Sequence, residues 1–190
     1  MVPNSKLLRT AEDKPNLIKG AKLEGYPNRN SFPFREDFKM LDTKTFLRGT
    51  LRYKGFSALM HTFVTCGFLS TNPEEIDLKK YHKLPFSQFI NELLLKDVEP
   101  EYPNQDARAA VENRSAKFPD EHQRDALLRM INKGASDSSE EELERFIDAV
   151  LFLELLSDET LIAESAKCVL DALCTVMSRK MMISVNSSYS

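Results

Sequence analysis

The spacing of apolar residues changes character near residue 55. Before it, short apolar stretches alternate with Gly, Pro and Asn, which predicts strands at 21–26 and 45–53 with one or two helical turns over 34–41 between them. After it, apolar residues recur three and four positions apart, which is the pattern of amphipathic helices. The predicted fold class is therefore mainly α with a small α/β segment.

Helices are predicted throughout the second part of the chain. The one near its end, at 160–178, has Asp158 as its expected N-cap, and the helix before it has Ser139 and Glu142 at the spacing of a capping box. Residues 181–190 start strand-like and end polar. The remaining helices are expected at 56–64 with a stop at Gly67, at 86–95 after Pro85, at 106–117 and at 120–132.

Charge follows the same division. Residues 1–55 carry 12 Lys and Arg against 6 Asp and Glu, a net +6, whereas 56–190 carry 14 against 23, a net −9. We expect three parts: an α/β segment at 1–54, a helical subdomain at 55–180 and a polar tail at 181–190. The basic charges are scattered among turns and form no basic helix, so nucleic-acid binding is the weakest of the readings.

Several classes of function lack their residue patterns here. No apolar run reaches the roughly 18 residues of a membrane helix, and no signal peptide is visible. The three cysteines and three histidines show no metal-ligand spacing, and the odd cysteine count favours a reducing compartment. Neither a nucleophile–base motif nor a phosphate or dinucleotide loop is present. We assign no catalytic, metal or cofactor-binding residue.

Three arginines surround the predicted strand at 45–53. Arg48 and Arg52 are four residues apart, so on an unbulged strand they point to the same face, and Gly49 between them marks a bulge or a close backbone approach. Arg29 lies in the preceding turn and joins them only if that loop folds back. Guanidinium groups bind carboxylates through two parallel hydrogen bonds. The cluster is either a solvated surface or a site for an anion.

Two sequence motifs favour a site for an anion over a solvated surface. The stretches "LEGYPNRNS" (23–31) and "FLRGTLRYKGFSALM" (46–60) resemble glutamate-forming saccharopine dehydrogenase, which in animals and plants is the C-terminal half of bifunctional aminoadipic semialdehyde synthase. Residues 155–173, "LLSDETLIAESAKCVLDAL", are similar to the end of that family's helical subdomain. The resemblance implies part of a substrate-binding α/β domain with its helical insertion.

The resemblance also implies an activity and a site. Members of the family oxidise saccharopine with NAD(P) and water to glutamate and aminoadipic semialdehyde in lysine metabolism, and a Rossmann domain holds the nucleotide. By resemblance, Arg29 and the segment Thr50, Leu51 and Arg52 bind saccharopine, with Asn28 and Tyr53 as further candidates. The expected partners are saccharopine and the missing Rossmann domain of the same parent enzyme, with no nucleic acid and no membrane.

The chain departs from the family in what it lacks. The nucleotide domain and the later strands of the sheet are absent from these 190 residues, and Asn4 and Ser5 stand where the family usually has two glycines. NAD(P) is therefore implied for the parent enzyme and not for this segment. The alternative is a non-catalytic helical interaction module derived from the family. The resemblance implies a mitochondrial location for an animal bifunctional enzyme and a cytoplasmic one otherwise.

Overall fold

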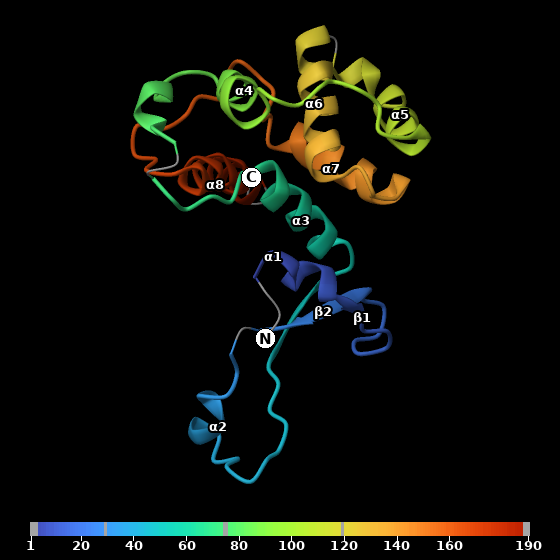
Figure 1. Ribbon diagram of the computed structural model, residues 1–190, viewed down its shortest axis with the longest axis vertical. Helices are drawn as coiled ribbons and strands as arrows, with labels where there is room; N and C mark the ends of the chain where they lie inside the picture. The colour runs from blue at the N-terminus through green and yellow to red at the C-terminus, as the bar shows by residue number, and fades with distance from the viewer. Residues whose placement is uncertain (1–3, 29, 74–75, 119, 188–190) are drawn as a thin grey trace. The chain divides into compact units, whose positions relative to one another are not determined.

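The computed structural model describes residues 4–28, 30–73, 76–118 and 120–187. The chain divides into two compact units, 1–61 and 62–190 (Figure 1). The first holds a small antiparallel sheet and the second is helical. This confirms the predicted fold class.

The first unit is built around a three-stranded sheet in the order β1-β2-β3. It opens with α1 (Asn4–Leu7) and a turn of 3-10 helix, η1 (Leu8–Thr10). The strands are β1 (Glu12–Asp13), β2 (Leu23–Pro27) and β3 (Gly49–Tyr53), and both strand pairs are antiparallel. The predicted strand at 21–26 is thus present within a residue or two.

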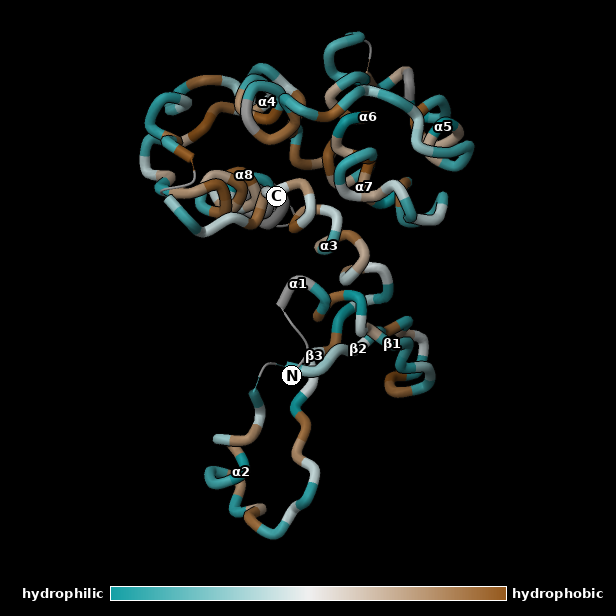
Figure 2. The backbone as a smooth tube through the Cα atoms, in the orientation of Figure 1, coloured by the Kyte–Doolittle hydropathy of each residue, from teal (hydrophilic) through white to brown (hydrophobic). Residues whose placement is uncertain are grey.

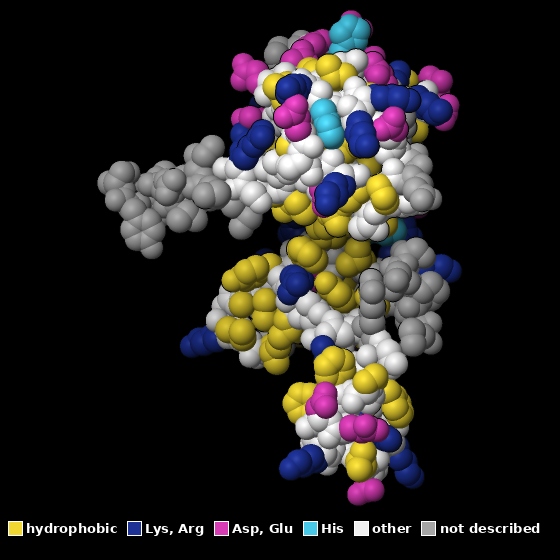
Figure 3. Space-filling model, turned by 90° about the vertical axis from the view of Figure 1, so that its left-hand side faces the viewer, with side chains coloured by type: hydrophobic (Ala, Val, Ile, Leu, Met, Phe, Trp, Pro, Cys, Tyr) yellow, Lys and Arg dark blue, Asp and Glu magenta, His cyan; other side chains and the backbone are white. Residues whose placement is uncertain are grey.

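A long loop connects β2 to β3 and carries α2 (Phe34–Asp37), the helical turn expected at 34–41. Apolar positions recur along this loop (Figure 2). On its surface they lie among Lys, Arg, Asp and Glu side chains (Figure 3). The exposed large apolar residues of the loop are Phe32, Phe34, Phe38, Met40, Leu41 and Leu47.

The strand predicted at 45–53 is shorter than expected, because only 49–53 pairs as β3. Residues 45–48 lie in the loop, where Phe46 packs at 6.0 Å from the ring of Phe38 and the backbone N–H of Arg48 donates to Ser31 Oγ at 3.1 Å. Gly49 begins the strand and forms no bulge, since it pairs in register with Pro27. Contacts within the loop thus replace residues 45–47 of the expected ladder, while the carbonyl of Arg48 still accepts from Asn28 N at 2.7 Å.

The second unit begins in the last turns of α3 (Phe56–Cys66), which stops at Gly67 with a φ of +93°, as predicted. A π-helical turn widens the helix expected at 86–95, and α5 packs against both α6 and α7. The elements that follow are η2 (Leu78–Tyr81), α4 (Phe86–Phe89), η3 (Ile90–Leu94), α5 (Gln105–Glu112), η4 (Ser115–Lys117), α6 (Glu121–Gly134), α7 (Glu140–Phe152) and α8 (Val169–Ser187).

Aromatic rings form the centre of the helical core. Phe63 packs edge-on against Phe68 and Phe146, with ring centroids 5.4 and 5.7 Å apart, and Phe86 meets Phe89 in the same geometry at 5.7 Å. Edge-to-face pairs of this kind add to the free energy gained from burying their surface. All five rings are buried, whereas Val64 on α3 and Met177 on α8, which the apolar spacing placed on the same faces as the core, are 38% and 40% exposed.

The helix α3 approaches the end of α6 closely at Gly134. A Cβ atom at this position would lie 2.8 Å from Cys66 Sγ and 2.9 Å from Thr62 O, which is closer than real Cβ atoms come. The thiol of Cys66 is itself buried and donates to Met130 O at 3.3 Å. Only glycine fits at residue 134 without a shift of one of the two helices.

The last helix begins later than predicted. The expectation of a helix from 160, capped by Asp158, is wrong, because the backbone at 160–162 pairs instead with 83–86. Three hydrogen bonds make this bridge: Lys83 N to Ile162 O at 2.9 Å, Ile162 N to Leu84 O at 3.0 Å and Phe86 N to Thr160 O at 2.7 Å.

The C-terminal end also differs from the expectation. Residues 181–187 continue α8, so the strand-like start predicted for the tail at 181–190 is wrong. Residues 188–190 lie outside the described residues. The capping box at Ser139 and Glu142 is confirmed at the start of α7. Among the described residues, no helix has both the length and the apolar character needed to cross a membrane.

Candidate functional site

The pairing of β2 with β3 brings most of the predicted site residues onto one surface. The register pairs Glu24 with Arg52 and Tyr26 with Thr50, and the backbone N–H of Asn28 extends the ladder by donating to Arg48 O at 2.7 Å. Because side chains alternate along a strand, these six residues share one face of the sheet. We call this surface the arginine face.

On this face Thr50 is joined directly to Asn28, since its hydroxyl donates to Asn28 Oδ1. The bond turns the amide nitrogen of Asn28 away from Thr50, as a donor for another group. The guanidinium of Arg48 lies 3.5 Å from the ring centroid of Phe34, a cation–π contact that holds the side chain at the base of the loop.

Arg52 is exposed and only lightly held. Its guanidinium donates to Leu51 O at 2.9 Å and lies 5.2 Å from the ring centroid of Phe56. The bond to Leu51 O uses Nη1, so a carboxylate can still bind the Nε and Nη2 edge of the guanidinium through two parallel hydrogen bonds. The structure therefore brings together Asn28, Thr50 and Arg52, and adds Arg48 to them.

The other predicted residues lie elsewhere. Leu51 and Tyr53 point to the opposite face of β3, where 45% and 76% of their surface is exposed. Arg29, predicted at the tip of the turn after β2, lies outside the described residues.

A hollow of about 520 Å³ opens at this end of the sheet. Of the predicted site residues, Thr50 and Leu51 line this hollow, whereas Asn28, Arg52 and Tyr53 do not. Gly25 forms part of its floor, where a Cβ atom would come within 3.2 Å of Lys14 Cε and 3.3 Å of Leu51 Cδ2. The lining residues are Thr10, Glu12, Lys14, Gly25, Tyr26, Pro27, Leu47, Arg48, Gly49, Thr50 and Leu51.

The charges around the hollow are partly balanced. Lys14 Nζ lies 2.9 Å from Glu12 Oε2, and this hydrogen bond, together with the lysine charge, lowers the pKa of the Glu12 carboxyl. Both groups are solvated, so their pair adds little stability. Lys14 and Arg48 both line the hollow, together with the acidic Glu12.

Sequence reasoning missed Glu24. Glu24 is 7% exposed, and its carboxylate accepts hydrogen bonds from Gly55 N at 2.9 Å, just before α3, and from Ser57 N at 2.6 Å, in the first turn of α3. The sequence did contain a sign of this role, because Gly55 occupies the N-cap position of α3, where Ser, Thr, Asp or Asn is usual. A helix start with no local cap indicates that a residue distant in sequence supplies it.

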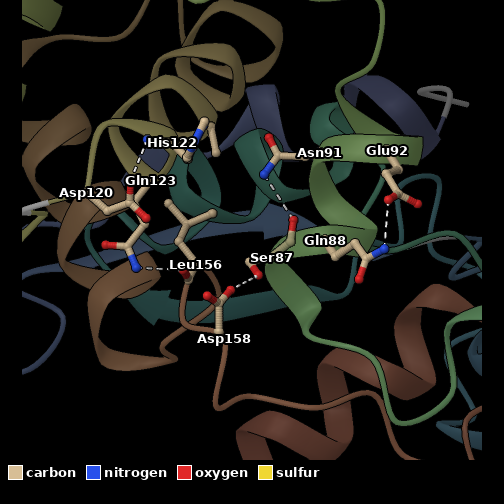
Figure 4. Close-up of a pocket in the computed structure, with 10 residues that line it drawn as sticks. Ser87, Gln88, Asn91, Glu92, Asp120, His122, Gln123, Leu156 and Asp158 are labelled. Carbon is tan, nitrogen blue, oxygen red and sulfur yellow. Dashed lines mark hydrogen bonds between the residues drawn. The ribbon is translucent and has the colours of Figure 1, made fainter.

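The helical unit has a polar hollow of about 310 Å³ between α4, α6 and the chain at 156–158 (Figure 4). Its side chains largely satisfy one another: Ser87 Oγ donates to Asp158 Oδ1 at 2.8 Å and Gln123 Nε2 to Leu156 O at 3.0 Å. Across the part of the chain that the structure describes, no group of three His, Cys, Asp or Glu could hold a metal ion. These bonds tie three segments together.

Comparison with known proteins finds relatives that match most of the chain. Alpha-aminoadipic semialdehyde synthase of Arabidopsis thaliana is 30% identical over 90% of this chain, and the saccharopine dehydrogenase [NADP(+), L-glutamate-forming] of Pyricularia oryzae is 28% identical over 95%. The match covers 14% of the plant protein and 34% of the fungal one, so this chain spans about a third of its relatives or less. Mammalian relatives that match 40% of the chain are named as mitochondrial.

The fold has a counterpart among solved structures. The apo saccharopine dehydrogenase (L-Glu forming) of Saccharomyces cerevisiae superposes with a TM-score of 0.64 at 22% identity, covering 91% of this chain and 32% of the yeast protein. The model of the saccharopine dehydrogenase C-terminal domain matches residues 1–189. With a match over nearly every residue, the chain belongs to the family of the saccharopine dehydrogenase C-terminal domain, whose relatives are oxidoreductases of lysine metabolism.

Proposed function

We propose that this chain supplies saccharopine-binding residues to an NAD(P)-dependent oxidoreductase that converts saccharopine to glutamate and aminoadipic semialdehyde. The observation that best supports this is the arginine face, on which Asn28, Thr50 and Arg52 lie together with Arg48. Saccharopine carries three carboxylates, and guanidinium, amide and hydroxyl groups are the donors that such a molecule requires.

The proposed roles follow from the contacts. The exposed guanidinium of Arg52 takes one carboxylate through paired N–H groups, and the amide nitrogen of Asn28 donates to the same ligand. Arg29 adds a second guanidinium from the turn, and the backbone of Thr50 and Leu51 lines the ligand. Tyr53 is a further candidate at the end of β3. Together these residues hold the substrate in place for oxidation and move no proton.

The name of the fungal relative specifies NADP(+), and a nicotinamide cofactor bound by the parent enzyme would supply the hydride acceptor. The antiparallel sheet of this chain does not fit a dinucleotide, which binds at the carboxyl ends of parallel strands with a glycine-rich turn. We therefore assign the cofactor to a Rossmann domain of the same parent enzyme. A mitochondrial location is proposed for an animal bifunctional parent, and a cytoplasmic one otherwise.

Calorimetric titration of the 190-residue chain with saccharopine tests the proposal, with NADPH and NADH as parallel ligands. We expect heat of binding from saccharopine and none from either nucleotide. A folded chain that binds nucleotide as well as saccharopine would contradict the assignment of the cofactor to another domain.

The alternative is a non-catalytic helical interaction module. It predicts a chain that melts cooperatively but binds none of the three ligands. Titration of the complete parent enzyme then decides whether the substrate residues need the missing domains: binding there, but not here, supports the proposal for the parent only.

A further inference from the structure

Glu24 is a buried carboxylate whose two oxygens are both occupied by the start of α3. Oε2 accepts from Gly55 N and Oε1 from Ser57 N, at 2.9 and 2.6 Å. A buried charge is costly unless it is hydrogen-bonded, and the N-terminus of a helix is where a negative charge is stabilised. The strand β2 thus caps a helix that begins 32 positions later in the sequence.

Glu24 lies opposite an arginine, yet its carboxylate binds backbone amides at the start of α3 instead. Its neighbour across the strand pair is Arg52, and a carboxylate beside a guanidinium ordinarily forms an ion pair with it. Here the guanidinium of Arg52 donates to Leu51 O and lies against Phe56, while the carboxylate faces the helix. The amides of α3 therefore keep the charge of Glu24 away from Arg52.

The same bonds also fix the chain that follows Arg52. The turn from β3 into α3 passes through Gly55 at a φ of +93°, and Lys54 N closes it by donating to Lys22 O at 3.0 Å. Through Gly55 N and Ser57 N, Glu24 joins β2 both to this turn and to the first turn of α3. The end of β3, with Thr50 and Arg52 on it, is held between the ladder and the cap.

We propose that Glu24 is a positioning residue of the arginine face: by capping α3 it anchors the segment Thr50–Arg52 and leaves the Arg52 guanidinium for a carboxylate of the ligand. The inference rests on the proposed function, since saccharopine is the ligand in question. Glu24 itself does not contact the substrate.

The substitution Glu24→Gln keeps the length of the side chain but replaces one acceptor by an NH₂ group, which cannot accept from an amide. We expect saccharopine to bind the folded chain about tenfold more weakly, because the segment Thr50–Arg52 is no longer held in its binding geometry. The direction of the change in saccharopine affinity tests the proposal. Removal of a negative charge near an anion site would by itself strengthen binding, so stronger or unchanged binding overturns the proposal.

Asp13→Asn is the matched control, because it also removes one negative charge from the same sheet at an exposed position, and Asp13 does not line the hollow. It should change the affinity for saccharopine less than about twofold. Affinities are compared per folded protein, with the folded fraction taken from circular dichroism, so that lost stability is not counted as lost affinity.

Amide hydrogen exchange separates failure of this inference from failure of the proposed function. If the wild-type chain binds no saccharopine, the proposed function fails here, and exchange alone decides the role of Glu24. If Glu24 positions the arginine face, amide exchange in Glu24→Gln should be faster both at Gly49–Tyr53 and in the first turn of α3. Faster exchange confined to α3 means that Glu24 is only a helix cap.

Discussion

The hydroxyl of Thr50 on β3 donates a hydrogen bond to the side-chain oxygen of Asn28, which lies just beyond the end of β2. The two residues are 22 positions apart, so the bond closes the long loop that carries α2. It links the orientation of a proposed ligand donor, the Asn28 amide, to the register of the strands. Its loss should affect both stability and binding.

Thr50→Val removes the hydroxyl and keeps the shape of the side chain. We expect unfolding to become easier by about 1 kcal/mol, the usual net contribution of such a bond, and Thr50→Ser to retain most of the stability. Urea unfolding measures the change. A double-mutant cycle with Asn28→Ala gives the coupling, and a coupling energy near zero would show that the two side chains act independently.

Arg52→Ala should weaken saccharopine binding by about 10- to 100-fold, because it removes charge-assisted hydrogen bonds. Arg52→Lys keeps the charge and loses the paired geometry, so an intermediate loss is expected. In a complete parent enzyme the KM for saccharopine should rise, while the affinity for nucleotide stays the same. Arg29→Ala should behave likewise.

Arg108→Ala is the control for these arginines, since Arg108 is an exposed arginine on α5 that pairs with Glu112. It should leave saccharopine binding unchanged. Equal losses of substrate and nucleotide affinity in the Arg52 variants would instead indicate that Arg52 supports the fold.

Gly134→Ala should destabilise the helical unit by about 1–3 kcal/mol, because the added methyl group overlaps Cys66 Sγ and Thr62 O. Alanine is the better helix former, so propensity alone predicts the opposite sign. Gly49→Ala is the control, as its Cβ would meet only Tyr26 O at an ordinary 3.4 Å. Thermal unfolding of both variants distinguishes the two effects.

Acid should weaken the helical unit through Asp148. Its carboxylate accepts from Arg114 Nε at 3.0 Å, and that hydrogen bond lowers the pKa of Asp148 below its ordinary 3.8. A carboxyl with a lowered pKa in the fold contributes stability above its unfolded pKa and loses it as the pH falls through the folded one. The loss should therefore appear below about pH 4.

The Asp148 carboxylate is 55% exposed, so the contribution should stay under about 1 kcal/mol and shrink in salt. Urea unfolding at pH 7 and pH 3 measures it. The stability of Asp148→Asn should fall less between these two pH values than that of the wild type, whereas Asp97→Asn, on an exposed turn, should follow the wild type. Identical pH dependence in Asp148→Asn and the wild type would argue against this pair.

The parts of the fold that local sequence determines were predictable. Ser139 and Glu142 cap α7 as expected, because both partners of a capping box lie within one turn. The helix predicted over 160–168 was wrong because Ile162 and Ala166 are buried whether the segment is a helix or a bridge. Only the pairing with 83–86 distinguishes these two structures. That pairing depends on a partner nearly 80 residues away.

The same limit applies to the candidate site. Arg48 and Arg52 could be placed on one face of a strand from their even spacing alone, and Thr50 and Asn28 joined them through the family resemblance. The role of Glu24 required knowing which helix follows β3 and how it begins. The division of roles between residues 1–54 and 55–180, and the part of Arg29 in binding, stay predictions.

The bridge between 83–86 and 160–162 sets the ends of a long stretch of chain side by side. Between these ends lie the four helices α4 to α7, so the chain enters and leaves this group at one place. A break in the exposed loop at 97–104 should therefore leave both parts of the group anchored at the bridge, whereas removal of the whole stretch would take away the rings of Phe86 and Phe146 that pack on Phe68 and Phe63.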